Sequence, residues 1–343
     1  MVLRIFFALT ASLVFCGSAL AADPVAPPSL EQSAHIQGHG VEALAGKRVM
    51  ILGDSITQNG TYVSYLEYFL QKSYPQQCFD IVSVGLASET TSGLSEPGHA
   101  GGAFPRPCVH ERLQRALDAV KPQMVVACYG MNDGIYKPYS DDIMKAFQDG
   151  VTKLVAVCQV AGAEVILVTP PVFEGGAYNE LLAKFAAWEV AQPPKGVVAV
   201  ADLHTVMAAV GAARQKIDPK FRFTSDNVHP GELGHVVMAQ AILQELFIPM
   251  CMGGVQSMTG ETNLNHPLEK GNPETLMAMA HADPLFKIVN QRRNLRSNGW
   301  LNYIGYTREK HVAPKTGDIG KLEAAAQELQ STIDMMKKNT STK

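Results

Sequence analysis

The chain has 343 residues, with 29 basic and 32 acidic side chains and a formal net charge of −3. Hydrophobic residues make up 46% of the sequence and charged residues 18%, compared with about 25% charged residues in an average soluble domain. This composition excludes an intrinsically disordered chain, a collagen-like repeat and a nucleic-acid-binding protein that acts through a large basic excess.

The first residues have the pattern of a secretory signal peptide. Residues 1–4 form a short basic start, and residues 5–22 carry no charge. The uncharged run ends with Ala19-Leu20-Ala21, the small-x-small pattern that a signal peptidase cleaves. We predict cleavage after Ala21, a secreted or periplasmic protein, a linker at residues 22–46 and no membrane span after cleavage. The alternative is a retained anchor, because 18 uncharged residues can just cross a bilayer.

The six cysteines are too sparse for a small disulfide scaffold. Cleavage would remove Cys16 and leave five, an odd number that excludes complete internal pairing. Export would permit a disulfide, and Cys78 and Cys108 are the candidate pair because both lie outside the apolar strand runs. Cys128 and Cys158 lie within apolar segments, which is typical of small buried hydrophobic residues.

Strand and helix patterns alternate along residues 47–249. Short apolar runs predict strands at residues 48–52, 79–84, 124–128, 164–168 and 197–203. Helical spacing predicts helices at residues 62–74, 109–120, 141–160, 179–190 and 232–247. Strands that are apolar throughout and separated by helices indicate a parallel sheet covered on both faces. Functional residues of such sheets gather in the loops at the carboxyl ends of the strands.

Three polar motifs occur at the expected loops. A Gly-Asp-Ser sequence ends at Ser55, directly after the first predicted strand, and a Gly-Met-Asn-Asp sequence containing Asn132 follows the third. An Asp-x-x-His-Pro sequence supplies Asp226 and His229 before the last predicted helix. An aspartate three residues before a histidine can orient the ring and leave its other nitrogen free as a general base. Taken singly, each motif is also common in turns and helix caps.

In this order and at these loops, the three motifs together resemble the SGNH (GDSL) hydrolase family over about residues 47–249. The resemblance implies a three-layer α/β/α sandwich with a five-stranded, flavodoxin-like parallel sheet. It implies serine esterase activity without a metal or an organic cofactor. Carried over by position, Ser55 would be the nucleophile, His229 the base, and Asp226 the residue that orients the base.

The same resemblance implies an oxyanion hole made of three N–H donors. The family uses the N–H of the nucleophile, here Ser55, a glycine N–H after the second strand, and an asparagine side chain, here Asn132. When the chain is aligned on the Glu89-Thr90 pair, Ser88 takes the glycine position. We expect the Ser88 N–H to serve if its φ angle stays negative. Gly85 is the alternative donor.

Motifs of other enzyme classes are missing from the sequence. There is no Gly-x-Ser-x-Gly nucleophile elbow, no P-loop and no dinucleotide fingerprint after a strand. His110 and the glutamate after it are followed by Arg-Leu-Gln, which does not complete a His-Glu-x-x-His zinc helix. His35 and His39 share i,i+4 spacing, but glycines surround them and we expect no metal there. His235 is expected to be a structural histidine rather than a second base.

Two further segments carry open alternatives. The glycine- and proline-rich loop at residues 92–107 either covers the substrate site or is a flexible surface loop. Residues 250–343 predict a mainly helical C-terminal extension, with a connector at 252–273, a helix at 274–290, an aromatic segment at 294–306 and an amphipathic helix at 319–338. The extension either packs on the hydrolase domain or presents Trp300, Tyr303 and Tyr306 as a carbohydrate-binding surface or oligomer interface. The oligomeric state is left open.

The sequence therefore predicts an exported serine esterase that hydrolyses acyl esters. The family includes carbohydrate deacetylases, lipases, lysophospholipases and thioesterases, so the fold does not determine the substrate. The predicted export and the lack of a long apolar lid segment in the sequence favour an enzyme that removes small acyl groups, acetyl above all, from carbohydrate. A lipase, lysophospholipase or thioesterase is the alternative, and a non-catalytic glycan-binding domain is a second one. The expected partner is a small acyl ester or an acylated glycan, and no nucleic acid.

Overall fold

The computed structural model describes residues 40–246, 248, 251–252, 255–256, 272–308, 311–312 and 318–341. The predicted signal peptide at residues 1–21 lies outside these residues, as do most of the linker at 22–46 and most of the connector at 252–273. His35 and His39 also lie outside them. All described residues belong to one compact unit. The division of the chain at residues 46 and 249 stays a prediction.

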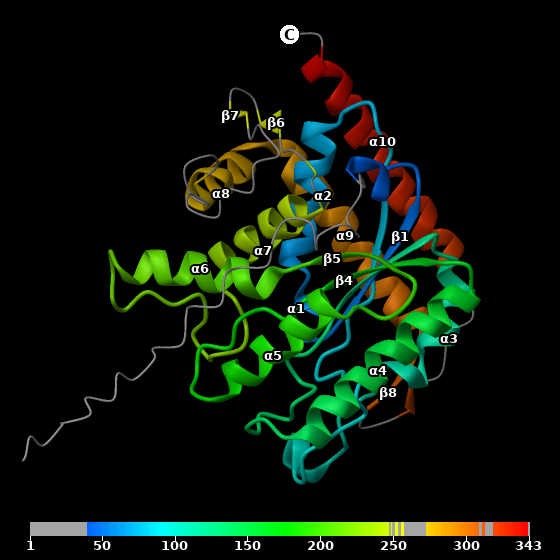
Figure 1. The fold of residues 1–343 in the computed structure, drawn as a ribbon. Coiled ribbons are helices and arrows are strands. Elements are labelled where there is room, and N and C mark those ends of the chain that lie inside the picture. The colour runs from blue at the N-terminus through cyan, green and yellow to red at the C-terminus, as the bar shows by residue number, and fades with distance from the viewer. Residues whose placement is uncertain are drawn as a thin grey trace, which may run out of the picture. The chain divides into compact units, whose positions relative to one another are not determined.

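A five-stranded parallel sheet forms the centre of this unit (Figure 1). Its strands are β1 (Arg48–Gly53), β2 (Asp80–Ser83), β3 (Met124–Cys128), β4 (Glu164–Val168) and β5 (Val197–Ala201). The order is β2-β1-β3-β4-β5, and every neighbouring pair is parallel. This is the flavodoxin-like order. The predicted fold class is confirmed.

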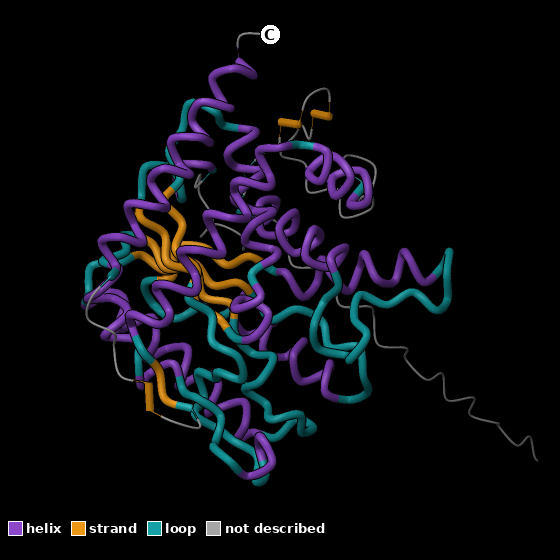
Figure 2. Tube along the Cα trace, turned by 180° about the vertical axis from the view of Figure 1, so that it is seen from behind, coloured by secondary structure: helices purple, strands orange, loops and turns teal. Residues whose placement is uncertain are grey.

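Helices cover both faces of the sheet (Figure 2). They are α1 (Ser55–Asn59), α2 (Thr61–Ser73), α3 (Leu113–Val120), α4 (Asp141–Val160), α5 (Tyr178–Ala191), α6 (Leu203–Gln215) and α7 (Glu232–Glu245). Short 3₁₀ helices lie at Val41–Ala43, His99–Gly102 and Val109–Glu111. Helices α2 and α7 pack together on one face, while α4 and α5 contact β4 and β5 from the other. Right-handed crossovers between parallel strands produce this two-sided arrangement.

Helix α6 was missed by the sequence prediction, which continued the fifth strand to Leu203. The strand ends at Ala201 because Asp202 caps a helix: its carboxylate accepts a hydrogen bond from the Thr205 N–H at 3.2 Å. The predicted helix at 109–120 is also divided, since a 3₁₀ turn precedes α3. An apolar run alone does not show where a strand ends and a capped helix begins.

The C-terminal extension is helical, but its elements differ from the prediction. It contains α8 (Pro273–Ala282), α9 (Pro284–Ile304) and α10 (Ile319–Ser341), with two short hairpins, β6 (Cys251–Met252) with β7 (Val255–Gln256) and β8 (Tyr306–Thr307) with β9 (His311–Val312). The prediction of a single helix at 274–290 is wrong, because two helices, α8 and α9, cover these residues. Asp283 ends α8 and caps α9, and the proline that follows occupies the first helical position, where its missing N–H costs nothing.

Helix α9 attaches the extension to the sheet. It packs against α2 and β2, and α10 packs on α9. Buried Arg296 donates to the Ile81 carbonyl of β2 at 2.9 Å, and Arg292 pairs with buried Glu67 of α2 at 2.7 Å. Trp300 is only 4% exposed, and its indole N–H donates to Glu323 of α10 at 2.6 Å. The extension therefore packs on the sheet layers, and Trp300 is unavailable for a carbohydrate surface.

The structure also tests the expected disulfide. Cys78 is exposed and Cys108 is partly buried, and both are free thiols, so the candidate disulfide is not formed. Cys128 and Cys158 are free and buried, as predicted. None of the helices in the part of the chain described by the structure combines the length and apolar character that a membrane span needs.

Candidate active site

Ser55 lies at a tight turn between β1 and α1. Asp54 caps α1 by accepting a hydrogen bond from the Ile56 N–H at 2.9 Å. Gly53 is required before the turn, because a Cβ there would collide with Thr57 and with the Cys128 carbonyl of β3. Ser55 is thereby placed in the first helical turn, where backbone N–H groups have no partner within the helix. Its side chain is partly exposed.

The structure brings Ser55, His229 and Asp226 into one hydrogen-bonded chain. Ser55 Oγ lies 2.8 Å from His229 Nε2, although the two residues are 174 positions apart. His229 Nδ1 lies 2.6 Å from Asp226 Oδ2. Because the carboxylate accepts a hydrogen bond from Nδ1–H, Nε2 of a neutral ring is left to accept the serine proton. This arrangement can activate a hydroxyl as a nucleophile.

Asp226 is held as a carboxylate by its own loop. Its Oδ1 accepts hydrogen bonds from the backbone N–H groups of Val228 at 2.9 Å and His229 at 2.8 Å. Burial by itself opposes ionisation, but these two bonds and the His229 ring outweigh it and lower the pKa of Asp226 to about 2. The group that orients His229 is therefore charged at neutral pH.

Glu174, which sequence reasoning missed, fixes the loop that precedes His229. Its carboxylate accepts hydrogen bonds from the backbone N–H groups of Phe223 and Thr224, both at 2.8 Å, and from the Thr224 hydroxyl at 2.7 Å. Its own N–H donates to the Asn227 carbonyl. No motif marks Glu174 in the sequence, because the contact joins two loops almost 50 residues apart.

Buried Asp133 joins the loops after β2 and β3. It accepts hydrogen bonds from the Thr91 N–H at 2.7 Å, the Ser92 N–H at 2.7 Å and the Gly130 N–H at 3.0 Å. Burial raises the pKa of Asp133 against the effect of these bonds. Its position directly after Asn132 in the Gly-Met-Asn-Asp sequence is the only sequence signal that points to it.

Ser88 and Gly85 lie in the loop after β2, where the structure corrects one expectation. The φ angle of Ser88 is +68°, in the left-handed region, and not negative as required above. This is a conformation that glycine adopts at little cost. A Cβ on Gly85 would collide with the backbone of α1 at Thr57 and Gln58, so Gly85 is needed for packing. Among the described residues, neither the Ser88 nor the Gly85 N–H has a hydrogen-bond acceptor.

Asn132 is buried beside the same loop. Its Nδ2 donates to the Glu89 carbonyl at 3.3 Å. Its Oδ1 accepts hydrogen bonds from Arg106 Nη1 at 2.9 Å and from the Tyr136 hydroxyl at 3.2 Å. Arg106 belongs to the loop at 92–107, so this loop borders the site. Sequence reasoning named neither Arg106 nor Tyr136 as a site residue.

His235 does not join the Ser55–His229–Asp226 chain. It is buried and stacks on Tyr62, with ring centroids 6.3 Å apart. Burial, reinforced by the positive charge of Arg293, lowers the pKa of His235 to about 4. The ring is therefore neutral at physiological pH, as expected of a structural histidine. In the described part of the chain, no group of three or more His, Cys, Asp or Glu side chains could hold a metal ion.

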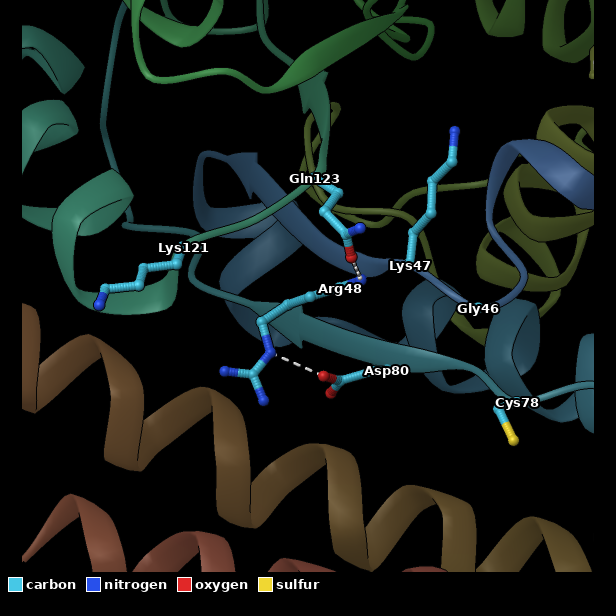
Figure 3. A pocket seen from close by; sticks show the side chains of 7 residues that line it. All are labelled: Gly46, Lys47, Arg48, Cys78, Asp80, Lys121 and Gln123. Atoms are coloured by element: carbon cyan, nitrogen blue, oxygen red, sulfur yellow. Dashed lines mark hydrogen bonds and ion pairs between the residues drawn. The ribbon is translucent and has the colours of Figure 1, made fainter.

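Two cavities lie outside this chain of residues. One of about 410 Å³ lies at the amino ends of β1 and β2, where Figure 3 shows Arg48 turned toward Asp80 and Lys47 and Lys121 on opposite sides. Ser55 lies at the other end of the strands, after the carboxyl end of β1. The other, of about 510 Å³, is lined by residues of the loop after β4, of α6 and of the segment that leads to Asp226. Its apolar lining consists largely of Val172, Phe173, Met207, Phe221 and Phe223.

Comparisons with known proteins place the sequence in a family. Residues 51–237, more than half of the chain, match the model of the GDSL-like lipase/acylhydrolase family. An acetylxylan esterase from Geobacillus stearothermophilus is 22% identical over 229 residues, which are 59% of this chain and 94% of that protein.

Two solved structures show similar chains. The crystal structure of Axe2, an acetylxylan esterase from Geobacillus stearothermophilus, is 21% identical with a TM-score of 0.42, over 59% of this chain and 94% of that chain. A gut microbial diltiazem-metabolizing enzyme is 18% identical with a TM-score of 0.44, over 60% of this chain and 47% of that chain. The family match, the parallel sheet and the loop motifs agree. The chain belongs to the GDSL-like lipase/acylhydrolase family and is an SGNH-type serine hydrolase of carboxylic esters.

Proposed function

We propose that this protein is an exported serine esterase that removes small acyl groups, acetyl above all, from carbohydrate through an acyl-enzyme. One observation carries the catalytic part of the proposal. The Ser55 hydroxyl, the His229 ring and the Asp226 carboxylate form a continuous hydrogen-bonded chain at the carboxyl edge of the sheet, with contacts of 2.8 and 2.6 Å. A non-catalytic glycan-binding domain would not need this complete arrangement.

The proposed reaction has two halves. Ser55 Oγ attacks the ester carbonyl carbon while its proton passes to His229 Nε2. When the tetrahedral intermediate collapses, the bond to the alcohol oxygen breaks and His229 returns the proton to that oxygen. Water then attacks the acyl-enzyme with His229 as base, and the carboxylic acid leaves. Asp226 stabilises the imidazolium that forms twice in this cycle.

Three donors are proposed for the oxyanion: the N–H groups of Ser55 and Ser88 and the side-chain amide of Asn132. We favour Ser88 over Gly85 because the carbonyl of its neighbour Glu89 binds Asn132 Nδ2 directly. Gly85 instead packs against the backbone of α1. Preorganised donors of this kind are each worth about 3 kcal/mol in the transition state.

Two observations support the proposed substrate: the name of a related protein and the solvent exposure of the His229 and Asp226 side chains. The matched acetylxylan esterase acts on a carbohydrate ester by its name. The side chains of His229 and Asp226 are 50% and 51% exposed, so the site is open enough for an ester carried on an oligosaccharide. A lipase or thioesterase is the second candidate. The apolar cavity of about 510 Å³, beside the segment that leads to Asp226, favours it by offering room for a longer acyl chain.

A chain-length series separates the two candidates. We expect kcat/KM to fall steeply from p-nitrophenyl acetate to the octanoate, and acetylated xylo-oligosaccharides to release acetate. An increase with chain length would favour the lipase or thioesterase. The Ser55→Ala variant is the control for both assays.

Export is tested by N-terminal sequencing of protein recovered outside the cytoplasm. The sequence of that protein should begin at Ala22.

A further inference from the structure

The Asn132 side chain has one hydrogen-bonding position left after its neighbours are counted. Its carbonyl oxygen has two lone pairs, and both are used, by Arg106 Nη1 at 2.9 Å and by the Tyr136 hydroxyl at 3.2 Å. Its NH₂ group has two protons, and one is donated to the Glu89 carbonyl at 3.3 Å. Within the described residues, the second N–H has no acceptor. The amide therefore presents one free donor, in a fixed orientation.

Arg106 is itself fixed before it reaches Asn132. Its Nε and Nη2 both donate to the Glu96 carboxylate at 2.6 Å, a bidentate pair that locks the plane of the guanidinium. Nη1 is left for Asn132. Arg106 is only 8% exposed, and its guanidinium carbon lies 5.3 Å from the centre of the Tyr136 ring. The Arg106 guanidinium therefore has a fixed orientation relative to Asn132.

Tyr136 is held in a strained backbone. Ile135 and Tyr136 have φ angles of +47° and +56°, so two consecutive residues with bulky side chains adopt the left-handed conformation. Such residues cost about 1–2 kcal/mol each and persist where the surrounding structure demands them. The Tyr136 ring packs on Tyr178 and Phe173, at centroid distances of 4.9 and 5.8 Å. This packing holds the hydroxyl on Asn132.

We propose that Arg106 and Tyr136 are positioning residues that orient and polarise the Asn132 amide, so that its free N–H faces the oxyanion. The inference rests on the esterase function proposed above. An unrestrained asparagine amide can turn by 180° and present its oxygen, which would repel the oxyanion. Two donors on Oδ1 prevent this turn. The charge of Arg106 also draws electron density toward Oδ1, which makes the free N–H a stronger donor.

A double-mutant cycle tests this role. Removing a charged donor should lower kcat about 10- to 100-fold in Arg106→Met, and removing a neutral one about 3- to 10-fold in Tyr136→Phe. KM for p-nitrophenyl acetate should change less than twofold, because the oxyanion exists only in the transition state. In an Asn132→Ala background, each substitution should cost less than a further twofold.

Matched controls separate this result from general damage. Arg48→Met removes an arginine paired with Asp80 at the opposite edge of the sheet, and Tyr139→Phe removes a hydroxyl bonded to Asp141. Both controls should keep wild-type kcat. If Arg106→Met loses its thermal transition, Tyr136→Phe decides through the same cycle. Full, multiplicative losses in the Asn132→Ala background, or a rise in KM alone, would overturn the positioning role. An inactive wild type would instead overturn the esterase function.

Discussion

Asp54, next to the proposed nucleophile Ser55, carries a carboxyl group whose pKa lies well above its ordinary value. The side chain is buried, and burial raises its pKa from 3.8 to about 7. Between about pH 4 and pH 7 the folded protein therefore holds a proton that the unfolded chain has lost. The Asp54 contribution to the free energy of unfolding therefore falls as pH rises through this window and is constant above it.

The Asp54→Asn variant removes this dependence while keeping an acceptor for the Ile56 N–H. We expect the variant to gain stability relative to the wild type as pH rises from 4 to 7, with no further gain at pH 8. Thermal unfolding of both proteins across this range provides the measurement. A difference in Tm that stays the same at every pH would show that Asp54 is ionised in the folded state.

Ser88 gives a second prediction from a single residue. Ser88→Gly relieves the left-handed strain at φ +68° and keeps the N–H, so it should raise the free energy of unfolding by about 0.5–1 kcal/mol. The kcat should stay within twofold of the wild type. A denaturant titration and an ester assay measure these two quantities. A tenfold loss of kcat in the folded variant would show that the serine hydroxyl, rather than the backbone, is needed.

At this scale, the sequence identified the residues that carry motifs and missed those that support them. Ser55, Asn132, Asp226 and His229 were nominated because each occupies a loop at the carboxyl end of the predicted sheet. The structure brings Ser55, His229 and Asp226 together. Arg106, Glu174 and Asp133 make contacts between loops, and no periodicity or spacing encodes such contacts. Tyr136 reaches Asn132 from four residues further along the same loop, through a left-handed backbone that the sequence does not reveal. The positive φ of Ser88 was missed for the same reason, since alignment carries no torsion angle.

Among the elements, α1 and α9 are linked although they lie far apart in the sequence. Arg293 of α9 donates from Nη1 to the carbonyl of Asn59, the last residue of α1, at 2.8 Å, and from Nε to Ser64 Oγ at 2.9 Å. Gly60 leaves room for the guanidinium, since a Cβ there would collide with it. Burial lowers the pKa of Arg293 to about 10. The helix that begins at Ser55 is thereby anchored by the extension.

Loss of this anchor should affect both stability and catalysis. We expect Arg293→Ala to lower the free energy of unfolding by about 2–4 kcal/mol, because buried charged hydrogen bonds and packing are lost together. Since α1 carries Ser55, kcat should also fall. Arg214→Ala, which removes an ion pair with partly exposed Glu274, should change both quantities little. Equal effects of the two variants would contradict the anchoring role of Arg293.

Sequence patterns located most elements but not the boundary between α8 and α9. The Asp283-Pro284 pair was a usable signal, because Asp is a common cap and proline a common first helical residue. For the aromatic segment at 294–306 the sequence left two alternatives open, packing on the hydrolase domain or a carbohydrate-binding or oligomer surface. The burial of Trp300 follows from α10, which covers α9 from later in the chain.

For the molecule as a whole, the extension is part of the same compact unit as the sheet. Helix α2 is buried along almost its whole length, and α9 covers much of it. A chain truncated after residue 271 would expose that apolar face to water. We expect this chain to be insoluble, or to unfold at a Tm at least 10 °C below that of the full chain. An unchanged Tm would show that residues 47–249 fold independently.

The central claim is that Ser55, His229 and Asp226 act as one catalytic unit. The most direct measurement is kcat for p-nitrophenyl acetate in wild type, Ser55→Ala, His229→Ala and the double variant, each with its thermal transition checked. Each single substitution should lower kcat by about 10⁴-fold or more, and the double variant should be scarcely worse than either, because the residues act together. Near-wild-type turnover by a folded Ser55→Ala protein would contradict the account.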